Sequence, residues 1–211
     1  AAADYTKLRA EQAARRASGS VKQLGIGVSV YVEITAGSSA GESAKIEVTQ
    51  DGRAVVFTGT SPHGQGHVTS WALIASDQTG IPMDKIDVVW GDTDLVPKGG
   101  GTMGSRSLQQ GGVAVHVAAG ELVEQARKHA ARLLEANEED VVFDKESASF
   151  HVTGTPAVAK SWADLSIALA KDGGLVQETD YVAQGATFPF GAHVSVVEVD
   201  TETGQVKMLR H

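Results

Sequence analysis

The stretch AKIEVTQDGRAVVFTGT, residues 44–60, carries the clearest folding signal in the chain. Two β-branched runs flank Asp51-Gly52, a dipeptide that favours the tight turn of a hairpin because glycine readily adopts positive φ. We predict one strand to Thr49 and a second to Thr58. The chain then runs through HGQGH (63–67) into a helix around Trp71, where apolar side chains recur at helical spacing and Gly80 supplies the end.

Outward from this hairpin, the remaining elements follow from the same periodicities. Before the hairpin we expect a helix at about 3–16 and a strand at 24–35. After it we expect a short strand ending near Trp90, an Ala-rich helix from about Leu108 to Asn137, two strands around an Asp144 turn, a helix capped by Ser161, and a last strand HVSVVEVD, 193–200. Strands and helices intermingle without strict βαβ alternation. The fold class predicted is therefore α+β, with mixed or antiparallel sheets and packed helices.

Three sections follow from this order of elements. Residues 1–35 give the end of a preceding helix and strand, 36–187 an α+β domain that begins with a small-residue loop (36–43), and 188–211 strands that return to a sheet shared with residues 20–35. The chain starts directly in helix-forming residues and stops just after a strand has opened. We therefore expect a piece of a longer protein.

Composition removes several classes of function. The 211 residues carry 26 acidic and 18 basic side chains, a formal net charge of -8, which argues against nucleic-acid binding because that needs clustered Lys and Arg. No Cys is present, so disulfides, thiolate metal sites and a thiol nucleophile are excluded within these residues. No run approaches the roughly 18 apolar residues of a membrane span, and we expect a cytoplasmic protein.

The segment Gly91 to Ser107 is long for a loop and rich in glycine. Its glycines let main-chain N–H groups approach a ligand, Thr102, Ser105 and Ser107 add hydroxyl groups, Arg106 adds positive charge, and a long helix follows. Such a combination suits an anionic phosphate. The alternative is a surface loop that binds nothing. A literal G-x-G-x-x-G at Gly99 is not a dinucleotide fingerprint, because no strand runs directly into it.

A second loop, HGQGH, lies between a strand and the Trp71 helix. His63 and His67 are four residues apart, as a helical metal pair would be, but the glycines between them disfavour a regular helix and a zinc site. Histidines that make hydrogen bonds or face solvent are the better interpretation. Asp92 and Asp94 are read as turn-stabilising residues. If one ligand contacts both loops, they must lie side by side, which is possible if the strands ending near Thr58 and Trp90 share a sheet packed by the Trp71 helix.

Together, GQGHVT, the GDTDxxP turn, GTMGSRS and FPFGAHVSVVEVDTETGQV resemble the molybdopterin-binding large subunits of molybdenum hydroxylases, the xanthine dehydrogenase, aldehyde oxidase and carbon monoxide dehydrogenase family. The likeness runs from about Ala3 to the last residue and is strongest to the carbon monoxide dehydrogenase-like branch. It implies that this chain is part of the molybdenum-cofactor-binding region of a larger subunit.

The resemblance also assigns roles to residues. It implies that Gln65 lies beside molybdenum and donates to one of its oxygen ligands, and that no residue of this chain binds the metal directly. The residues implied to touch the pterin or its phosphates are Gly66, His67 and Thr69, and those implied to hold the phosphate region are Thr102, Gly104, Ser105 and Ser107. The implied cofactor is molybdopterin cytosine dinucleotide with molybdenum, bound in the full-length subunit and absent from this piece.

Two parts of the family's site are missing from this sequence. The resemblance implies that the catalytic glutamate of the family lies beyond His211 and that the substrate-facing loop lies before Ala1. The expected function is thus a fragment, inactive alone, of an oxidoreductase that hydroxylates carbon monoxide, an aldehyde or an N-heterocycle with water. Its expected partners are an iron–sulfur small subunit and a flavin medium subunit. The alternative function is a non-catalytic module that binds a phosphate ligand or another protein.

Overall fold

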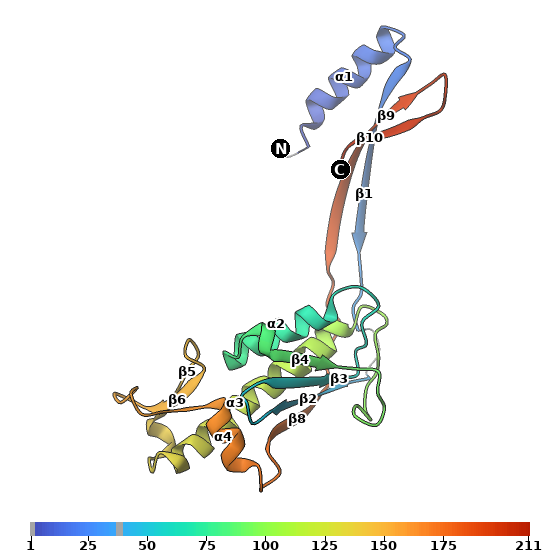
Figure 1. Cartoon of the computed structure of the whole chain (residues 1–211). Coiled ribbons are helices and arrows are strands. Elements are labelled where there is room, and N and C mark those ends of the chain that lie inside the picture. Colours follow the sequence, from blue (N-terminus) through green and yellow to red (C-terminus); the bar gives the residue numbers. More distant parts are fainter. Residues whose placement is uncertain (1–2, 37–39) are drawn as a thin grey trace. The chain divides into compact units, whose positions relative to one another are not determined.

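The computed structural model describes residues 3–36 and 40–211, which form two compact units (Figure 1). We call the part formed by residues 3–33 and Phe188–His211 the ribbon unit, and the part formed by Ile34–Thr187 the core unit. The predicted loop 36–43 lies partly outside the described residues, since 37–39 are not among them. The predicted α+β class with mixed and antiparallel sheets is confirmed.

A four-stranded mixed sheet is the centre of the core unit, in the order β4-β3-β2-β8. Its strands are β2 (Glu42–Val48), β3 (Ala54–Thr58), β4 (Ile86–Val89) and β8 (Leu175–Tyr181). The predicted hairpin is confirmed: β2 and β3 are antiparallel and the Thr49 N–H donates to the Arg53 carbonyl at 2.9 Å. The edge strand β8 was not predicted, because LVQETDY has little apolar alternation.

Three helices pack on this sheet and close its core: α2 (His67–Thr79), α3 (Val113–Leu133) and α4 (Trp162–Leu169). Alternate residues of β2, among them Ile46, point into the core, where Trp71 of α2 and Leu122 of α3 are fully buried. Gly80 ends α2 with φ +67°, as predicted. Ser161 caps α4 in a reciprocal capping box with Asp164, which confirms the predicted N-cap.

The helix expected from Leu108 begins differently. Ser107–Gly112 form a π-helical turn, and α3 follows from Val113 to Leu133. Two glycines explain the wide turn, because a Cβ at Gly111 would lie 2.6 Å from Thr60 and one at Gly112 would lie 2.9 Å from the Trp71 ring. Within α3, Ala118, Leu122, Ala126 and Ala130 are buried, whereas Val113 and Val117 are only partly buried and Leu133 is exposed.

A small antiparallel sheet completes the core unit, with β5 (Val141–Asp144), β6 (Ser149–Val152) and β7 (Ala159–Ser161) in that order. Its aromatic residues Phe143 and Phe150 pack on Trp162 of α4. Short 3₁₀ turns precede β4 and β5, at Met83–Lys85 and Glu138–Asp140.

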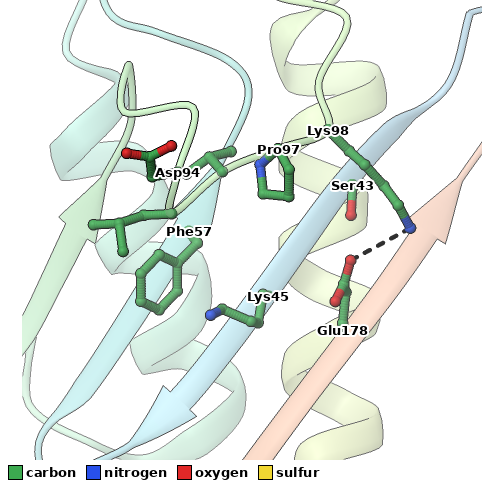
Figure 2. Close-up of a pocket in the computed structure, with 9 residues that line it drawn as sticks. Ser43, Lys45, Phe57, Asp94, Pro97, Lys98 and Glu178 are labelled. Atoms are coloured by element: carbon green, nitrogen blue, oxygen red, sulfur yellow. Dashed lines mark ion pairs between the residues drawn. The ribbon is translucent and has the colours of Figure 1, made fainter.

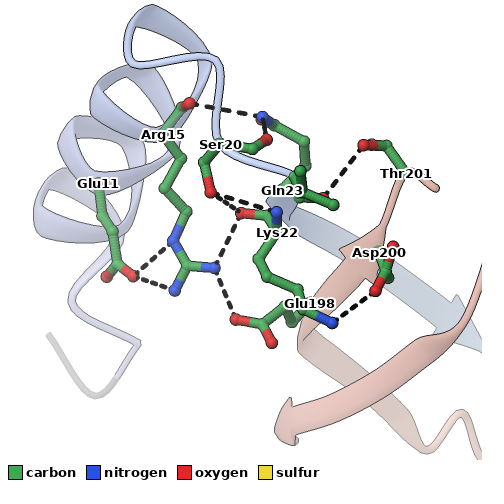
Figure 3. A network of polar contacts seen from close by, with 9 residues as sticks. Glu11, Arg15, Ser20, Lys22, Gln23, Glu198, Asp200 and Thr201 are labelled. Atoms are coloured by element: carbon green, nitrogen blue, oxygen red, sulfur yellow. Dashed lines mark hydrogen bonds and ion pairs between the residues drawn. The ribbon is translucent and has the colours of Figure 1, made fainter. Parts of the chain in front are cut away.

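The ribbon unit is a helix beside a long antiparallel ribbon. It contains α1 (Tyr5–Ala17), β1 (Lys22–Val32), β9 (Phe190–Asp200) and β10 (Val206–Arg210), with sheet order β1-β9-β10. Figure 3 shows the polar network that ties α1 to the ribbon: Arg15 donates to Glu11 and to Glu198, each at 2.7 Å, and Lys22 pairs with Asp200 at 2.6 Å. Among the described residues, no helix combines the length and the apolar character that crossing a membrane requires.

Candidate functional site

The two glycine-rich loops leave neighbouring parallel strands of the same sheet. β3 pairs with β4 in parallel, so the residues after Thr58 and after Val89 emerge at the same edge. The loops touch there: a Cβ added to Gly59 would lie 2.4 Å from the Gly99 Cα. The prediction that these strands share a sheet packed by the Trp71 helix is confirmed. That one ligand contacts both loops stays a prediction.

In the first loop, Gln65 presents an amide donor. Its Oε1 accepts a hydrogen bond of 2.5 Å from the His63 backbone N–H, and a backbone N–H can only donate. The amide nitrogen therefore faces the other way, and it has no hydrogen-bond partner among residues 3–36 and 40–211. Gln65 is exposed, and so is Thr69 in the first turn of α2. Both are placed where an external group could reach them.

His67 is held in place by the chain itself. Its Nδ1 lies 3.1 Å from the Thr60 carbonyl, which can only accept, so Nδ1 carries a proton and donates to it. The ring also packs on Trp71, with centroids 5.1 Å apart. His67 is buried whereas His63 is exposed. Within the described ranges no three His, Asp or Glu side chains are grouped as metal ligands.

In the second loop, Thr102 to Ser107 form a closed arch. The Arg106 N–H donates to the Met103 carbonyl, and the Ser107 hydroxyl donates to the Thr102 hydroxyl, both at 3.1 Å. Gly104 and Ser105 at its tip both have φ of +53°, and this conformation is strained for serine. Backbone strain of this kind is concentrated at ligand-binding sites. Ser105 is exposed at the tip and Ser107 is buried at the base.

Arg106 does not offer its charge to a ligand, which corrects the expectation from the sequence. It is 2% exposed and points beneath the arch. Its Nη1 donates to the Glu42 carboxylate and to the Gly101 carbonyl, both at 2.7 Å, and its Nη2 donates to the carbonyls of Ala40 and Gly41 at 2.8 and 2.6 Å. A guanidinium with four acceptors already in place serves the protein's own loops.

The glycines of the two loops divide into two groups, which corrects a second expectation. Gly99 and Gly100 are tightly packed: a Cβ at Gly100 would lie 2.5 Å from the Arg106 guanidinium, and the Gly100 N–H donates to Glu42 at 3.0 Å. These backbones are not available to a ligand. Gly64, Gly66 and Gly104 have positive φ and no atom within 4 Å of an added Cβ, so their backbones border open space.

The π-helical turn contributes two residues that sequence reasoning missed. Gln109 accepts from the Thr35 hydroxyl at 2.5 Å, and the Gln110 carbonyl oxygen accepts from the Ala183 N–H at 2.9 Å. The Ala36 N–H in turn donates to Gly104 at 3.1 Å. The turn thus holds the backbone segments at Thr35 and Ala183, and Ala36 joins the first of these segments to the arch. The only feature of the sequence that could have predicted this role is the Gln109-Gln110 pair directly after the serines. Nothing in the sequence marked Glu42 as buried, because an acidic residue in a strand usually faces water.

The segment between β4 and the glycines folds over the outer face of the sheet (Figure 2). The Asp94 N–H donates to Asp92 at 2.9 Å, confirming the turn-stabilising interpretation. A pocket of about 220 Å³ lies under residues 94–98. Lys98 pairs there with Glu178 at 3.5 Å and Asp180 at 3.4 Å, and Lys45 lies 3.9 Å from the Phe57 ring centre. The Lys98 charge is therefore paired within the chain.

Comparison with known proteins agrees with these features. All of residues 1–211 match a family model described as a molybdopterin cofactor-binding domain. The chain is 37% identical over 226 residues to the carbon monoxide dehydrogenase large chain of Hydrogenophaga pseudoflava, covering 99% of this chain and 28% of that protein. It is 33% identical to the gamma subunit of the 6-hydroxypseudooxynicotine dehydrogenase complex of Paenarthrobacter nicotinovorans, covering 99% and 27%.

The fold comparison gives the same family. A crystal structure of Cu,Mo-CO dehydrogenase superposes with a TM-score of 0.86 and 34% identity, covering 99% of this chain and 29% of that one. The chain spans less than a third of the length of these relatives. The resemblance to large subunits of the carbon monoxide dehydrogenase-like branch is confirmed.

Proposed function

This chain belongs to the molybdopterin cofactor-binding domain family, and we propose that its two loops hold the two ends of one pterin dinucleotide. Gln65, Gly66, His67 and Thr69 would contact the pterin end, with the Gln65 amide donating toward an oxygen ligand of molybdenum. The arch residues Thr102, Gly104, Ser105 and Ser107 would contact the phosphates. The cofactor that we propose is molybdopterin cytosine dinucleotide.

The observation that carries this proposal is a pair of donor-bearing loops at one sheet edge. The Gln65 amide nitrogen has no partner in the described chain, and the backbones of Gly64, Gly66 and Gly104 border open space. The arch adds three hydroxyl groups just before a helical segment, an arrangement that favours anions. These donors fit a polar, anionic cofactor, and Arg106 is not needed as a ligand.

In the whole large subunit, the bound cofactor would supply the oxidation by which a small substrate gains an oxygen atom from water. This chain's residues would orient the cofactor and donate hydrogen bonds to it. The catalytic acid–base group and the substrate-facing loop would come from other parts of the subunit. Electrons would pass to iron–sulfur and flavin partner subunits. The 211 residues alone would be inactive.

The direct test uses the full-length subunit in its complex. Ser105→Ala combined with Ser107→Ala removes two hydroxyls of the arch, the exposed one of Ser105 and the buried one of Ser107 that donates to Thr102. A hydrogen bond to a charged group contributes about 1.5–3 kcal/mol. We expect the pterin dinucleotide released from the purified protein to fall about tenfold or more. Ser147→Ala, an exposed serine in the β5–β6 turn, is the matched control and should leave the content unchanged. Unchanged content in the double variant would contradict the proposal.

The isolated chain gives a complementary test. Because affinity depends on several preorganised segments, residues 1–211 alone should hold far less than one molybdenum per chain. Metal analysis of the purified chain, with the full-length subunit as control, measures this. Stoichiometric molybdenum in the isolated chain would show that these loops suffice on their own.

A further inference from the structure

We infer that Glu42 and Arg106 are positioning residues for the phosphate-binding arch, and that Arg106 itself is not a ligand. This rests on the proposed function of the arch. Glu42 and Arg106 are 64 residues apart, yet their charged atoms lie 2.7 Å from each other with side chains 0% and 3% exposed. A buried ion pair is costly to form and needs further hydrogen bonds. Here Nη1 and Nη2 of Arg106 make them, while its buried Nε has no partner among the described residues.

The carboxylate of Glu42 joins three parts of the molecule. Glu42 is the first residue of β2 in the central sheet. Its two carboxylate oxygens accept hydrogen bonds from the Gly100 N–H at 3.2 and 3.0 Å, and one of them also accepts from Arg106. The approach to the second loop is thereby fixed to a rigid strand. Gly59 and Gly99 allow it, since a Cβ on either would meet the other's backbone or Glu42 within 3.1 Å.

Arg106 is the counterpart on the other end of the loop. It stands between Ser105 and Ser107, and its side chain reaches back to three backbone carbonyls as well as to Glu42. A lysine has one ammonium group and cannot reproduce this fork of donors. Gly100 and Arg106 both donate hydrogen bonds to Glu42, so the backbone is held in place on both sides of the segment from Gly101 to Ser105. The directions of the Ser105 and Ser107 side chains follow from this anchoring.

Glu42→Gln separates positioning from direct charge recognition because the two predict opposite signs. If Arg106 bound phosphate directly, removing the negative charge of Glu42 would favour an anionic cofactor. If Glu42 positions the arch, the same change leaves Gly100 and Arg106 without their shared carboxylate, and cofactor retention falls. The variant is nearly isosteric, so the packing of β2 is preserved.

The experiment uses the full-length subunit in its complex and measures pterin dinucleotide retained after gel filtration. We expect Glu42→Gln and Arg106→Lys each to lower retention about tenfold or more, because small misplacements at a preorganised site have large effects. Exchange of the Gly100 and Arg106 amide hydrogens should speed up in Glu42→Gln, while amides of α2 keep their rates. This second readout reports on the arch without any ligand.

Two controls isolate the effect. Arg53→Lys alters a surface ion pair in which the Arg53 guanidinium lies 2.9 Å from the Asp87 carboxylate. Ile46→Ala weakens the packing of the core at a buried residue of β2, the strand that also carries Glu42. Both should retain the dinucleotide. Full or increased retention of the dinucleotide in Glu42→Gln would overturn the inference, and so would an equal loss in Ile46→Ala. Failure of both Glu42→Gln and Arg106→Lys to assemble into the complex would also overturn it, because the effect must be confined to the loop. A wild-type subunit without pterin dinucleotide would instead defeat the proposed function itself.

Discussion

The core unit and the ribbon unit use apolar residues in opposite ways. In the core unit, alternate residues of β2 and β3 are buried under α2 and α3, and Ile46, Val56 and Trp71 are at most 1% exposed. In the ribbon unit, Val30 of β1 is 74% exposed and Phe190 of β9 is 82% exposed. In both units side chains alternate between the two faces of each strand, but only in the core unit does a layer of helices cover the apolar face.

This difference shows what alternation in a strand does and does not determine. Opposite one another on the ribbon lie three apolar pairs: Val28 with Val194, Val30 with Ala192, and Val32 with Phe190. They gather on one face because side chains alternate across a strand. Burial needs a covering layer. Among the described apolar residues of the ribbon unit only Leu24 and Val196 are buried, and α1 packs on β1, the strand of Leu24. Stability in the core unit is therefore internal. The uncovered end of the ribbon, where β1 pairs with β9 beyond the reach of β10, contributes little because two strands alone are marginally stable.

The largest expected effect is in the core. Trp71→Ala should lower the free energy of unfolding by about 3–5 kcal/mol, because it removes a fully buried aromatic side chain. Val30→Ala on the ribbon should change it by no more than about 0.5 kcal/mol. Urea denaturation of the two variants measures both values. Comparable losses would show that the ribbon face is buried after all.

A smaller effect distinguishes glycines that are packed from glycines that are not. Gly59→Ala places a methyl group 2.5 Å from the Glu42 carboxylate and nearer still to Gly99, and should cost about 1–3 kcal/mol. Gly27→Ala in β1 meets nothing within 4 Å and should fall within about 0.5 kcal/mol of wild type. Thermal unfolding under identical conditions compares them. A harmless Gly59→Ala would mean that the two loops do not touch.

The smallest effect is electrostatic and belongs to the ribbon unit. The Lys22 ammonium, helped by the N–H groups of Thr203 and Glu202, lowers the pKa of Asp200 to about 2. Because the folded pKa is below the unfolded value of about 3.9, this stabilisation is present above pH 4 and is lost as the pH falls through 2. NMR titration of the carboxyl carbon follows it. In Lys22→Met the midpoint should rise, and an unmoved midpoint would remove Lys22 as the cause.

Much of the fold could be predicted because its signals are local. Asp51-Gly52, Gly80 and Ser161 each act on their own neighbours, and all three are found in their predicted roles. The strand β8 was missed because its position depends on pairing with β2, from which it is more than 120 residues distant. The π-helical turn was missed for a similar reason, since Thr60 and Trp71 press against its glycines.

The candidate site could be predicted only as a set of loops. Glycines, hydroxyls and an amide identify donor-rich segments, but sequence cannot separate residues that face a ligand from those that hold the loop. Arg106 illustrates this, because its charge between two serines resembles a phosphate ligand until Glu42 is seen opposite it. That partner is 64 positions away in a strand with no distinguishing pattern.

The most direct test of the central claim is a crystal structure of the full-length subunit with its cofactor bound. The account predicts one pterin dinucleotide touching the Gln65 amide at one end and the Ser105 or Ser107 hydroxyl at the other, with Arg106 still paired to Glu42. A cofactor that touches only one of the two loops, or an Arg106 that has left Glu42 for a phosphate, would contradict it.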